Sequence, residues 1–250
     1  MFLFRSTTAK LGTGENVGLQ LYRASYSVAG RQILSGLSLH LTEQRIGIVG
    51  RNGSGKTTLL RLLAGLISPT EGYVRVEDID PAKNRNMLLA KLGILFQNPD
   101  HQIIFPTVEE EIAFGLRQLG QSQSEALRVA RDILLKEELG HWAPRPTCEL
   151  SQGQRQFLCL LSVLAMQPST LLLDEPYAAL DLPTQLRLRH RLANLPQRLI
   201  TISHDPSTLM QQDRVIWIEG GSIQADGEPD EVLQAFSIEM HRIGREECLH

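Results

Sequence analysis

The sequence predicts an α/β domain built on a mostly parallel β-sheet, and two observations indicate this fold class. Short apolar runs with the length of buried strands recur along the chain, and segments with helical spacing of apolar residues lie between them. The clearest runs are RIGIVG (45–50), KLGILF (91–96), STLLLD (169–174), RLITIS (198–203) and RVIWIE (214–219). Near-continuous apolar strands of this kind are typical of sheets covered on both faces.

The remaining elements follow in order. Strands are expected at LQLYRASY (19–26) and at LSLHL (37–41), whose leucines alternate strictly, and a helix at KTTLLRLLAGL (56–66). Helical patterns then dominate at TVEEEIAFGLRQL (107–119), SEALRVARDILLKEEL (124–139) and QGQRQFLCLLSVLAM (152–166). The spacings of Thr107 with Glu110 and of Ser122 with Glu125 predict capping boxes. We expect an arm at 1–18, a domain at 19–238 with a helical insert at about 98–166, and a short tail at 239–250.

The composition argues against several function classes. Of 250 residues, 42% are apolar and 21% are charged, as in ordinary globular proteins. The net charge of −3 provides no basic surface, so we expect no nucleic-acid partner. We find no run near the ~20 apolar residues of a membrane-spanning helix, and no pattern of a signal peptide. Cys148, Cys159 and Cys248 lack C-x-x-C spacing, which indicates incidental thiols in a reducing compartment.

A phosphate-binding loop is the strongest single motif. The segment GRNGSGKTT fits G-x-x-x-x-G-K-[ST] between a predicted strand and a predicted helix. Its glycines let backbone N–H groups curl around a phosphate, and the helix N-terminus adds partial positive charge. Lys56 is placed to reach the β- and γ-phosphates, and the Thr57 hydroxyl to ligate Mg²⁺. The predicted nucleotide-binding residues are Gly50, Arg51, Asn52, Gly53, Ser54, Gly55, Lys56, Thr57 and Thr58.

An acidic pair supplies the matching chemistry. TLLLDEP brings Asp174 and Glu175 to the carboxyl end of a buried strand, where ligands of α/β sheets bind. Asp174 is suited to holding Mg²⁺, and Glu175 to activating an attacking water as general base. A solvated turn is the alternative explanation of such a pair, and the neighbouring phosphate loop favours chemistry.

A second anion site is predicted at CELSQGQRQ (148–156). Ser151 and the amides after it precede a long apolar helix, so they form another positive helix N-terminus. Ser151 serves equally as a plain helix cap, which remains an alternative.

Together these motifs resemble the ATP-binding-cassette ATPases, from Leu19 to about Phe236. The family's order is present as GRNGSGKTT, Gln97 after a strand, LSQGQ, LLLDEP, AALD and TISH (201–204). The resemblance implies an antiparallel β subdomain beside the parallel core, and ATP with Mg²⁺ as cofactors. It also implies a head-to-tail homodimer, or a heterodimer with a paralogue, that holds ATP between one subunit's phosphate loop and the other's LSQGQ.

The same resemblance implies residue roles. Gln97 would sense Mg²⁺ and the attacking water, His204 would contact the γ-phosphate, and Asp181 would communicate across the dimer. Mg²⁺ would be held by Thr57, Gln97 and Asp174, and the partner's ATP by Leu150, Ser151, Gln152, Gly153 and Gln154.

Three of these roles have open alternatives or departures. Tyr26 would stack on adenine, although Tyr22 competes for that role and Tyr26 is also suited to packing against the sheet. A histidine after an apolar strand, such as His204, is commonly a capped or solvent-facing residue. Gln152 replaces the first glycine of the usual LSGGQ, which restricts the backbone and adds bulk.

The stretch FQNPDHQIIFPTVEEEIAFG (96–115) contains acids and a histidine, but a metal site is disfavoured. Asp100 and His101 point apart in an extended segment, and the glutamates at 109–111 fan around a helical turn where they complement the dipole. An acidic, partly apolar groove suits a partner with a basic amphipathic helix. The predicted coupling residues are Asp100, Gln102, Phe105, Glu109 and Glu110.

This stretch closely resembles the ATPases of energy-coupling-factor importers. That resemblance implies a multispanning transmembrane scaffold and a small substrate-capture membrane protein as partners, and a peripheral location on the cytoplasmic face of the membrane. Cobalt or nickel is the first substrate it suggests, and biotin the second. The alternatives are the ATPase of another transporter class of the same superfamily, or a soluble ATP-gated interaction protein.

Overall fold

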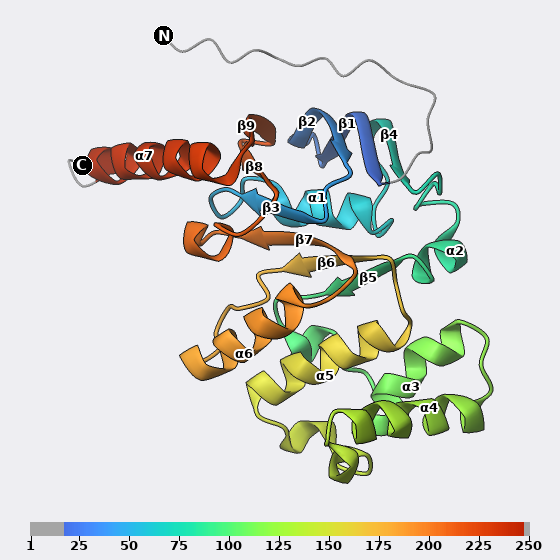
Figure 1. Ribbon diagram of the computed structural model, residues 1–250. Coiled ribbons are helices and arrows are strands. Elements are labelled where there is room, and N and C mark those ends of the chain that lie inside the picture. Colours follow the sequence, from blue (N-terminus) through green and yellow to red (C-terminus); the bar gives the residue numbers. More distant parts are fainter. Residues whose placement is uncertain (1–17, 248–250) are drawn as a thin grey trace.

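The computed structural model describes residues 18–247, and two β-sheets organise them (Figure 1). The larger sheet has six strands in the order β5-β6-β7-β3-β8-β9, and the smaller has three in the order β2-β1-β4. The strands are β1 (Leu19–Val28), β2 (Arg31–Leu41), β3 (Arg45–Val49), β4 (Glu71–Val76), β5 (Leu92–Leu95), β6 (Thr170–Asp174), β7 (Arg198–Ser203), β8 (Arg214–Glu219) and β9 (Ser222–Gly227).

Strand directions confirm the predicted fold class. In the larger sheet β5, β6, β7, β3 and β8 are parallel, and only the edge strand β9 runs antiparallel. The smaller sheet is wholly antiparallel. A mostly parallel core with an antiparallel β subdomain is therefore present.

Helices cover both faces of the larger sheet. Figure 1 shows α1 between the two sheets, with α5 and α6 on the opposite face and α3 and α4 beyond them. The helices are α1 (Lys56–Leu63), α2 (Arg85–Leu89), α3 (Val108–Gln118), α4 (Gln123–Lys136), α5 (Gln152–Ala165), α6 (Leu182–Ala193) and α7 (Pro229–Glu247). Short 3₁₀ turns lie at Pro99–His101, Gly140–Trp142, Thr147–Glu149 and Pro206–Thr208.

The burial of both faces of strand β6 explains why its sequence is a continuous apolar run. Leu172 packs with the core around α1, whereas Leu171 and Leu173 pack on the other face with residues of α5 and α6. All three leucines are fully buried. Successive side chains of a strand face opposite sides, so a strand covered on both sides is apolar throughout.

Helix α5 belongs to two cores at once. Leu158 and Leu161 pack with α3 and α4, while Cys159 and Leu160 pack against the sheet. A helix that is apolar on most of its surface is expected to be buried between layers in this way. Any movement of the helical insert relative to the sheet must therefore involve α5.

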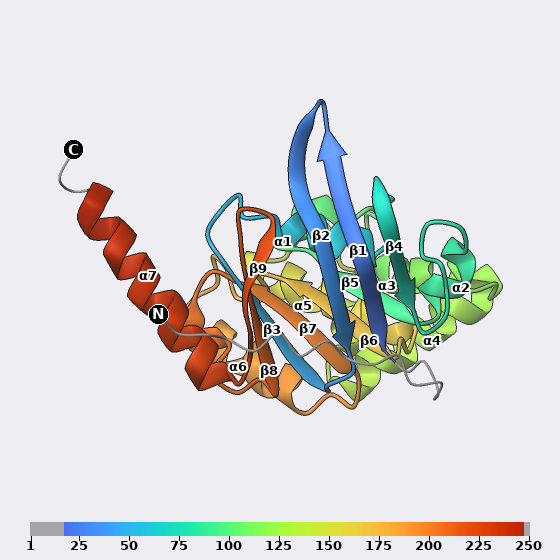
Figure 2. The same ribbon diagram turned by 90° about the horizontal axis from the view of Figure 1, so that it is seen from above.

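One local prediction was wrong. Thr107 does not cap α3 with its side chain; its hydroxyl donates to the Glu110 carboxylate instead, because an ionised acceptor forms the stronger hydrogen bond. The segment expected to be a short tail, 239–250, belongs to α7 as far as Glu247. Figures 1 and 2 show α7 projecting from the body of the domain. Ser122 does cap α4, accepting from the Glu125 amide.

Among residues 18–247, none of the helices combines the length and the apolar character that crossing a bilayer requires.

Candidate functional site

The phosphate loop joins β3 to α1, and close packing explains two of its glycines. A Cβ on Gly50 would lie 2.1 Å from the Ile218 carbonyl oxygen, which no side chain tolerates. Gly55 has φ +109°, and a Cβ there would lie 2.6 Å from a methyl group of Leu34. Both positions need glycine because the backbone passes against β8 and β2.

Lys56 is buried inside this loop. Its Nζ donates to the carbonyl oxygens of Gly50, at 2.7 Å, and of Arg51, at 2.8 Å. Burial lowers the pKa of Lys56, and the negative charges of Glu175, Asp174 and Glu219 oppose that shift. Lys56 thus keeps its positive charge near several carboxylates, and it can bind a phosphate group, which carries more negative charge than a carbonyl oxygen.

Ser54 indicates the same preference for an anion. Its hydroxyl is buried in the loop and has no hydrogen-bond partner among the described residues. A buried donor of this kind requires explanation, and a phosphate oxygen is a suitable acceptor. The loop therefore fits a nucleotide phosphate.

Asp174 lies at the carboxyl end of β6 and is 6% exposed. Burial raises the pKa of Asp174, and the neighbouring charge of Glu175 raises it further. The Thr57 side chain acts in the opposite direction and lowers the pKa of Asp174, so the two predicted Mg²⁺ ligands are neighbours. A hydroxyl and a carboxylate at one point are the hard oxygen ligands that Mg²⁺ prefers.

Glu175 is fixed by the neighbouring strand. Its backbone N–H donates to Ile202, and its carboxylate lies 2.8 Å from Nδ1 of His204 and 3.4 Å from Oγ of Ser203. Its φ of +48° is a left-handed conformation, which is uncommon for glutamate. Such strain is characteristic of functional positions. The predicted pair of Glu175 and His204 is therefore brought together.

Sequence reasoning missed Ser203. It is the last residue of β7, which is the neighbour of β6. A polar residue at the carboxyl end of an adjacent parallel strand is the signal that would have identified it.

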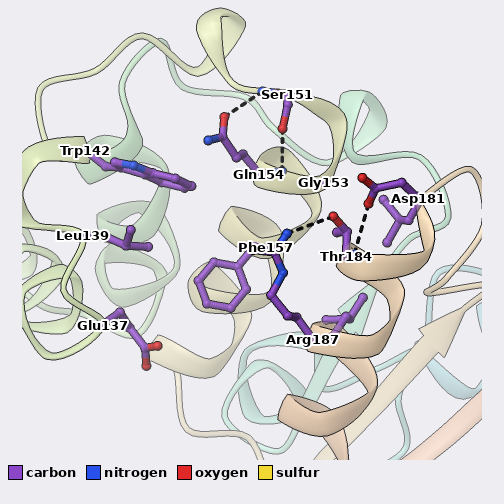
Figure 3. Close-up of a pocket in the computed structure, with 12 residues that line it drawn as sticks. Glu137, Leu139, Trp142, Ser151, Gly153, Gln154, Phe157, Asp181, Thr184 and Arg187 are labelled. Atoms are coloured by element: carbon purple, nitrogen blue, oxygen red, sulfur yellow. Dashed lines mark hydrogen bonds between the residues drawn. The ribbon is translucent and has the colours of Figure 1, made fainter.

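Three of the predicted signature residues, Ser151, Gly153 and Gln154, line one cavity of about 500 Å³ together with Asp181, as Figure 3 shows. Ser151 begins α5 with a complete capping box, in which its hydroxyl accepts from the Gln154 amide and the Gln154 side chain accepts from the Ser151 amide. Gly153 packs against Thr184 of α6, and a Cβ added to Gly153 would lie 2.7 Å from the methyl group of Thr184. The cap and the anion site suggested for Ser151 are thus compatible, because both use the first turn of one helix.

Asp181 caps the next helix. Its carboxylate accepts from the Thr184 amide at 3.0 Å. The Thr184 side chain, followed by this amide and by the nearby charge of Arg187, lowers the pKa of Asp181. The other two predicted signature residues do not line the cavity: Leu150 is buried and Gln152 is exposed.

The structure does not decide whether Tyr26, the residue predicted to stack on adenine, has that role. Tyr26 is partly buried against the core and pairs across the strands with Leu34, the residue that touches Gly55. Tyr22 instead stacks on Tyr73, with ring centroids 5.3 Å apart. Tyr26 is therefore the nearer of the two to the phosphate loop along β1 and β2, and its adenine role stays a prediction.

Residues 96–115 form a closed network rather than an open acidic groove. Glu111 is 4% exposed and accepts from the amides of Ile104 and Phe105, so it holds the turn before α3. The carboxylates predicted to couple to a partner have intramolecular contacts, namely Asp100 with Arg155, Glu109 with Arg131 and Glu110 with Thr107.

Gln102 and Phe105 are also engaged within the chain. The Gln102 side chain accepts from the Phe96 amide and donates to the Ile94 carbonyl, which makes it part of the loop that carries Gln97. Phe105 packs on Phe114 at 5.0 Å. Gln97 itself is exposed two residues after β5, in the position expected for a residue that meets a ligand.

Comparison with known proteins agrees with this geometry. Residues 34–178 match the family model described as ABC transporter. The chain is 51% identical over 86% of its length to the biotin transport ATP-binding protein BioM of Rhodobacter capsulatus, covering 92% of that protein. It is 34% identical over 84% of its length to the cobalt import ATP-binding protein CbiO of Syntrophus aciditrophicus, covering 78% of that protein.

A solved structure is similar as well. CbiO1 of Clostridium perfringens, described as part of the ABC transporter complex CbiONQ, matches with a TM-score of 0.75 and 27% identity, over 93% of this chain and 99% of that one. The predicted resemblance to ATPases of the cobalt and biotin importers is thereby confirmed. The chain accordingly belongs to the ABC transporter family and is one of its ATP-hydrolysing ATPases.

Proposed function

We propose that this chain is the ATPase subunit of an energy-coupling-factor importer for biotin. The observation that carries the proposal is the 51% identity to a biotin transport ATP-binding protein over 86% of the chain. The hydrolytic residues at the carboxyl edge of the sheet support it, because Lys56, Asp174 and Glu175 keep the groups needed for phosphoryl chemistry.

At this edge Lys56 exchanges its contacts with loop carbonyls for phosphate oxygens. Glu175 accepts the proton of the attacking water, and His204 orients the Glu175 carboxylate through Nδ1. Mg²⁺ would be held by Thr57, Asp174 and Gln97, and when bound it neutralises charge on the phosphates.

The active unit in this proposal is a head-to-tail dimer. Ser151, Gly153, Gln154 and Asp181 line a cavity to which the phosphate loop does not contribute, which supports their binding a nucleotide held by a second copy. A capped helix N-terminus beside Gly153 offers backbone N–H groups to the partner's γ-phosphate. Two identical sites are favoured because one chain carries every motif.

The membrane partners are a multispanning scaffold and a small capture protein, which places the chain on the cytoplasmic face of the membrane. The surface proposed to meet the scaffold is the 97–115 region, where Asp100 remains 60% exposed despite its ion pair. An exposed carboxylate attracts a basic helix. Ile104, which is also exposed in this region, offers an apolar contact.

Biotin replaces cobalt or nickel as the leading substrate. The biotin relative is 51% identical and the cobalt relative 34%, so the order suggested by the sequence alone is reversed. Cobalt stays the second candidate, because that relative is also matched over most of the chain.

Reconstitution tests the proposal. The chain is co-produced with candidate scaffold and capture proteins from the same organism, in cells that cannot take up biotin, and labelled biotin and cobalt are measured separately. Biotin should accumulate with the natural chain and not with Lys56→Ala, which removes the phosphate contact. Cobalt uptake without biotin uptake would make the chain a metal importer subunit. Copurification with ribosomes or DNA in place of membrane proteins would favour the soluble interaction protein.

A further inference from the structure

The turn between β8 and β9 contacts the phosphate loop at both of its ends. At the start of the loop, the Arg51 N–H donates to the Glu219 carboxylate at 3.3 Å. At its end, the Gly221 N–H donates to the Ser54 carbonyl oxygen at 3.0 Å. Residues of one turn therefore hold the phosphate loop along its length.

The same turn also contacts the antiparallel subdomain, and Figure 1 shows β9 beside β2. The Gly221 carbonyl oxygen accepts from the Ser35 N–H of β2 at 2.9 Å. Gly221 has φ +75°, and a Cβ there would lie 2.2 Å from the Ile33 carbonyl oxygen and 3.2 Å from the Cα of Leu34. This position needs glycine because β2 passes directly against the turn.

Leu34 connects these contacts to the strand that carries Tyr26. It is fully buried and pairs with Tyr26 across β1 and β2. One of its methyl groups is also the atom that a Cβ on Gly55 of the phosphate loop would meet. Because protein interiors are close-packed, a side chain added at Gly221 must move β2, and Tyr26 with it, relative to the loop.

From these contacts we propose that Glu219 and Gly221 are positioning residues for the nucleotide. Glu219 holds the start of the phosphate loop, and Gly221 sets the distance between this loop and the strands that hold the base. The proposal rests on the nucleotide site of the proposed function and on the predicted stacking of adenine on Tyr26. Phosphates and base are bound together only when the turn lies close against β2.

The test compares magnesium ADP with magnesium pyrophosphate, which has the same two phosphates and lacks adenosine. Both dissociation constants are measured on the full chain by isothermal titration calorimetry. Their ratio, the preference for ADP, reports how well the base is held while the phosphates are bound. A base stacked on an aromatic side chain is worth roughly five- to 150-fold in affinity, so the natural chain should prefer ADP by at least about fivefold.

Gly221→Ala should lower the preference for ADP at least about fivefold, while the affinity for pyrophosphate stays within about twofold. Gly220→Ala is the matched control, because Gly220 also has a positive φ, +55°, but a Cβ there meets nothing within 4 Å. This control should keep the natural preference. Tyr26→Ala should lose the preference to a similar extent, and adding Gly221→Ala to it should cause little further loss.

Two variants with the same change of charge test Glu219. Glu219→Gln and Glu219→Ala both remove the carboxylate, and only glutamine keeps an acceptor for the Arg51 N–H. The alanine variant should bind ADP and pyrophosphate about two- to tenfold more weakly than the glutamine variant, with the same preference for ADP. Equal affinities in the two variants would mean that Glu219 does not position the loop.

The remaining outcomes separate the positioning role from the nucleotide site. An unchanged preference in folded Gly221→Ala, or an equal loss in Gly220→Ala, would overturn the role of the contact with β2. A natural chain that binds ADP no more tightly than pyrophosphate would overturn it too, and would leave the phosphate site intact. Failure to bind either ligand would instead overturn the nucleotide site of the proposed function. Thermal melting shows which variants fold, and if Gly221→Ala does not, Leu34→Val shortens the side chain between the loop and Tyr26 and should lower the preference in its place.

Discussion

Glu175→Gln is the most informative single change, because it alters charge and basicity while keeping shape. The amide carries both a donor and an acceptor, so it can keep the contacts that the carboxylate makes with His204 and Ser203. The strained backbone at Glu175 is unaffected, since the hydrogen bond from its N–H to the Ile202 carbonyl oxygen does not involve the side chain. The variant should therefore fold and bind nucleotide.

The magnitude follows from the lost proton acceptor. General-base catalysis contributes about 10²- to 10⁴-fold, which is about 2.7–5.4 kcal/mol of barrier. The loss of the Glu175 charge should also affect ATP binding, which it should strengthen. The charge of Glu175 lies close enough to Asp174 and Lys56 to act on both of their pKa values, and its removal lowers repulsion toward the triphosphate. A gain of about 1 kcal/mol, or roughly fivefold in ATP affinity, is expected.

Two measurements on the same protein test this reasoning. Steady-state phosphate release should fall by at least about 100-fold, and size-exclusion chromatography with ATP should show a persistent dimer. Glu71→Gln on the exposed edge strand β4 is the control and should match the natural chain. Turnover within about threefold of the natural rate would remove Glu175 from the general-base role. Loss of the ATP-dependent dimer would place the residue in nucleotide binding instead.

Three further predictions concern the rest of the site. Gly153→Ala should lower ATP turnover at least about tenfold with little change in melting temperature, because its Cβ would push the start of α5 away from Thr184. Asp174→Asn should raise the melting temperature of the nucleotide-free protein and abolish Mg²⁺-dependent hydrolysis, since it removes a buried charge and a metal ligand. Mass spectrometry after alkylation should find Cys148 modified and Cys159 protected, because burial raises the pKa of Cys159 to about 12.

The Asp174→Asn prediction has a defined pH dependence. Because the pKa of Asp174 is raised on folding, the native state binds this proton more tightly than the unfolded state does. The carboxylate therefore destabilises the fold above its folded pKa and ceases to do so below its unfolded value. The melting-temperature gain should be largest near neutral pH and vanish in acid, and a constant gain across pH would contradict the electrostatic explanation.

Controls for the other two predictions come from the same chain. Gly244→Ala, in the part of α7 where a Cβ meets open space, should leave turnover unchanged. Normal turnover in Gly153→Ala would show that the contact with Thr184 does not set the signature. Equal alkylation of both cysteines in the folded protein would mean that the helix carrying Cys159 opens readily.

The local motifs were predictable because their constraints are local. Gly50 and Gly55 must be glycine to let the backbone pass its neighbours, and Lys56 follows them at a spacing fixed by the helix start. The apolar run that ends at Asp174 likewise predicted, from the sequence alone, that this side chain lies at the carboxyl end of a buried strand.

What the sequence did not predict depends on contacts between distant segments. Glu111 was expected only to complement the dipole of a first helical turn, but the segment before α3 brings the amides of Ile104 and Phe105 to its carboxylate, which compensates for burial. Gln156 likewise finds its partner 60 residues away in the chain. Periodicity reports which face of a helix is apolar, and cannot report which loop covers it.

Asp100 shows how the two kinds of inference interact. Its position in the 97–115 region suggested contact with a membrane partner, and its carboxylate is paired with Arg155 within the chain. An incoming basic helix would compete with Arg155 for this one carboxylate. Reversing the charge of Asp100 alone disturbs both contacts, so it cannot tell which of them matters for assembly. The double variant Asp100→Arg with Arg155→Asp restores an internal pair of opposite charges while the exposed position 100 presents the opposite sign, so assembly with the scaffold should still be lost. Recovery of assembly in this double variant would show that the scaffold does not need the Asp100 carboxylate.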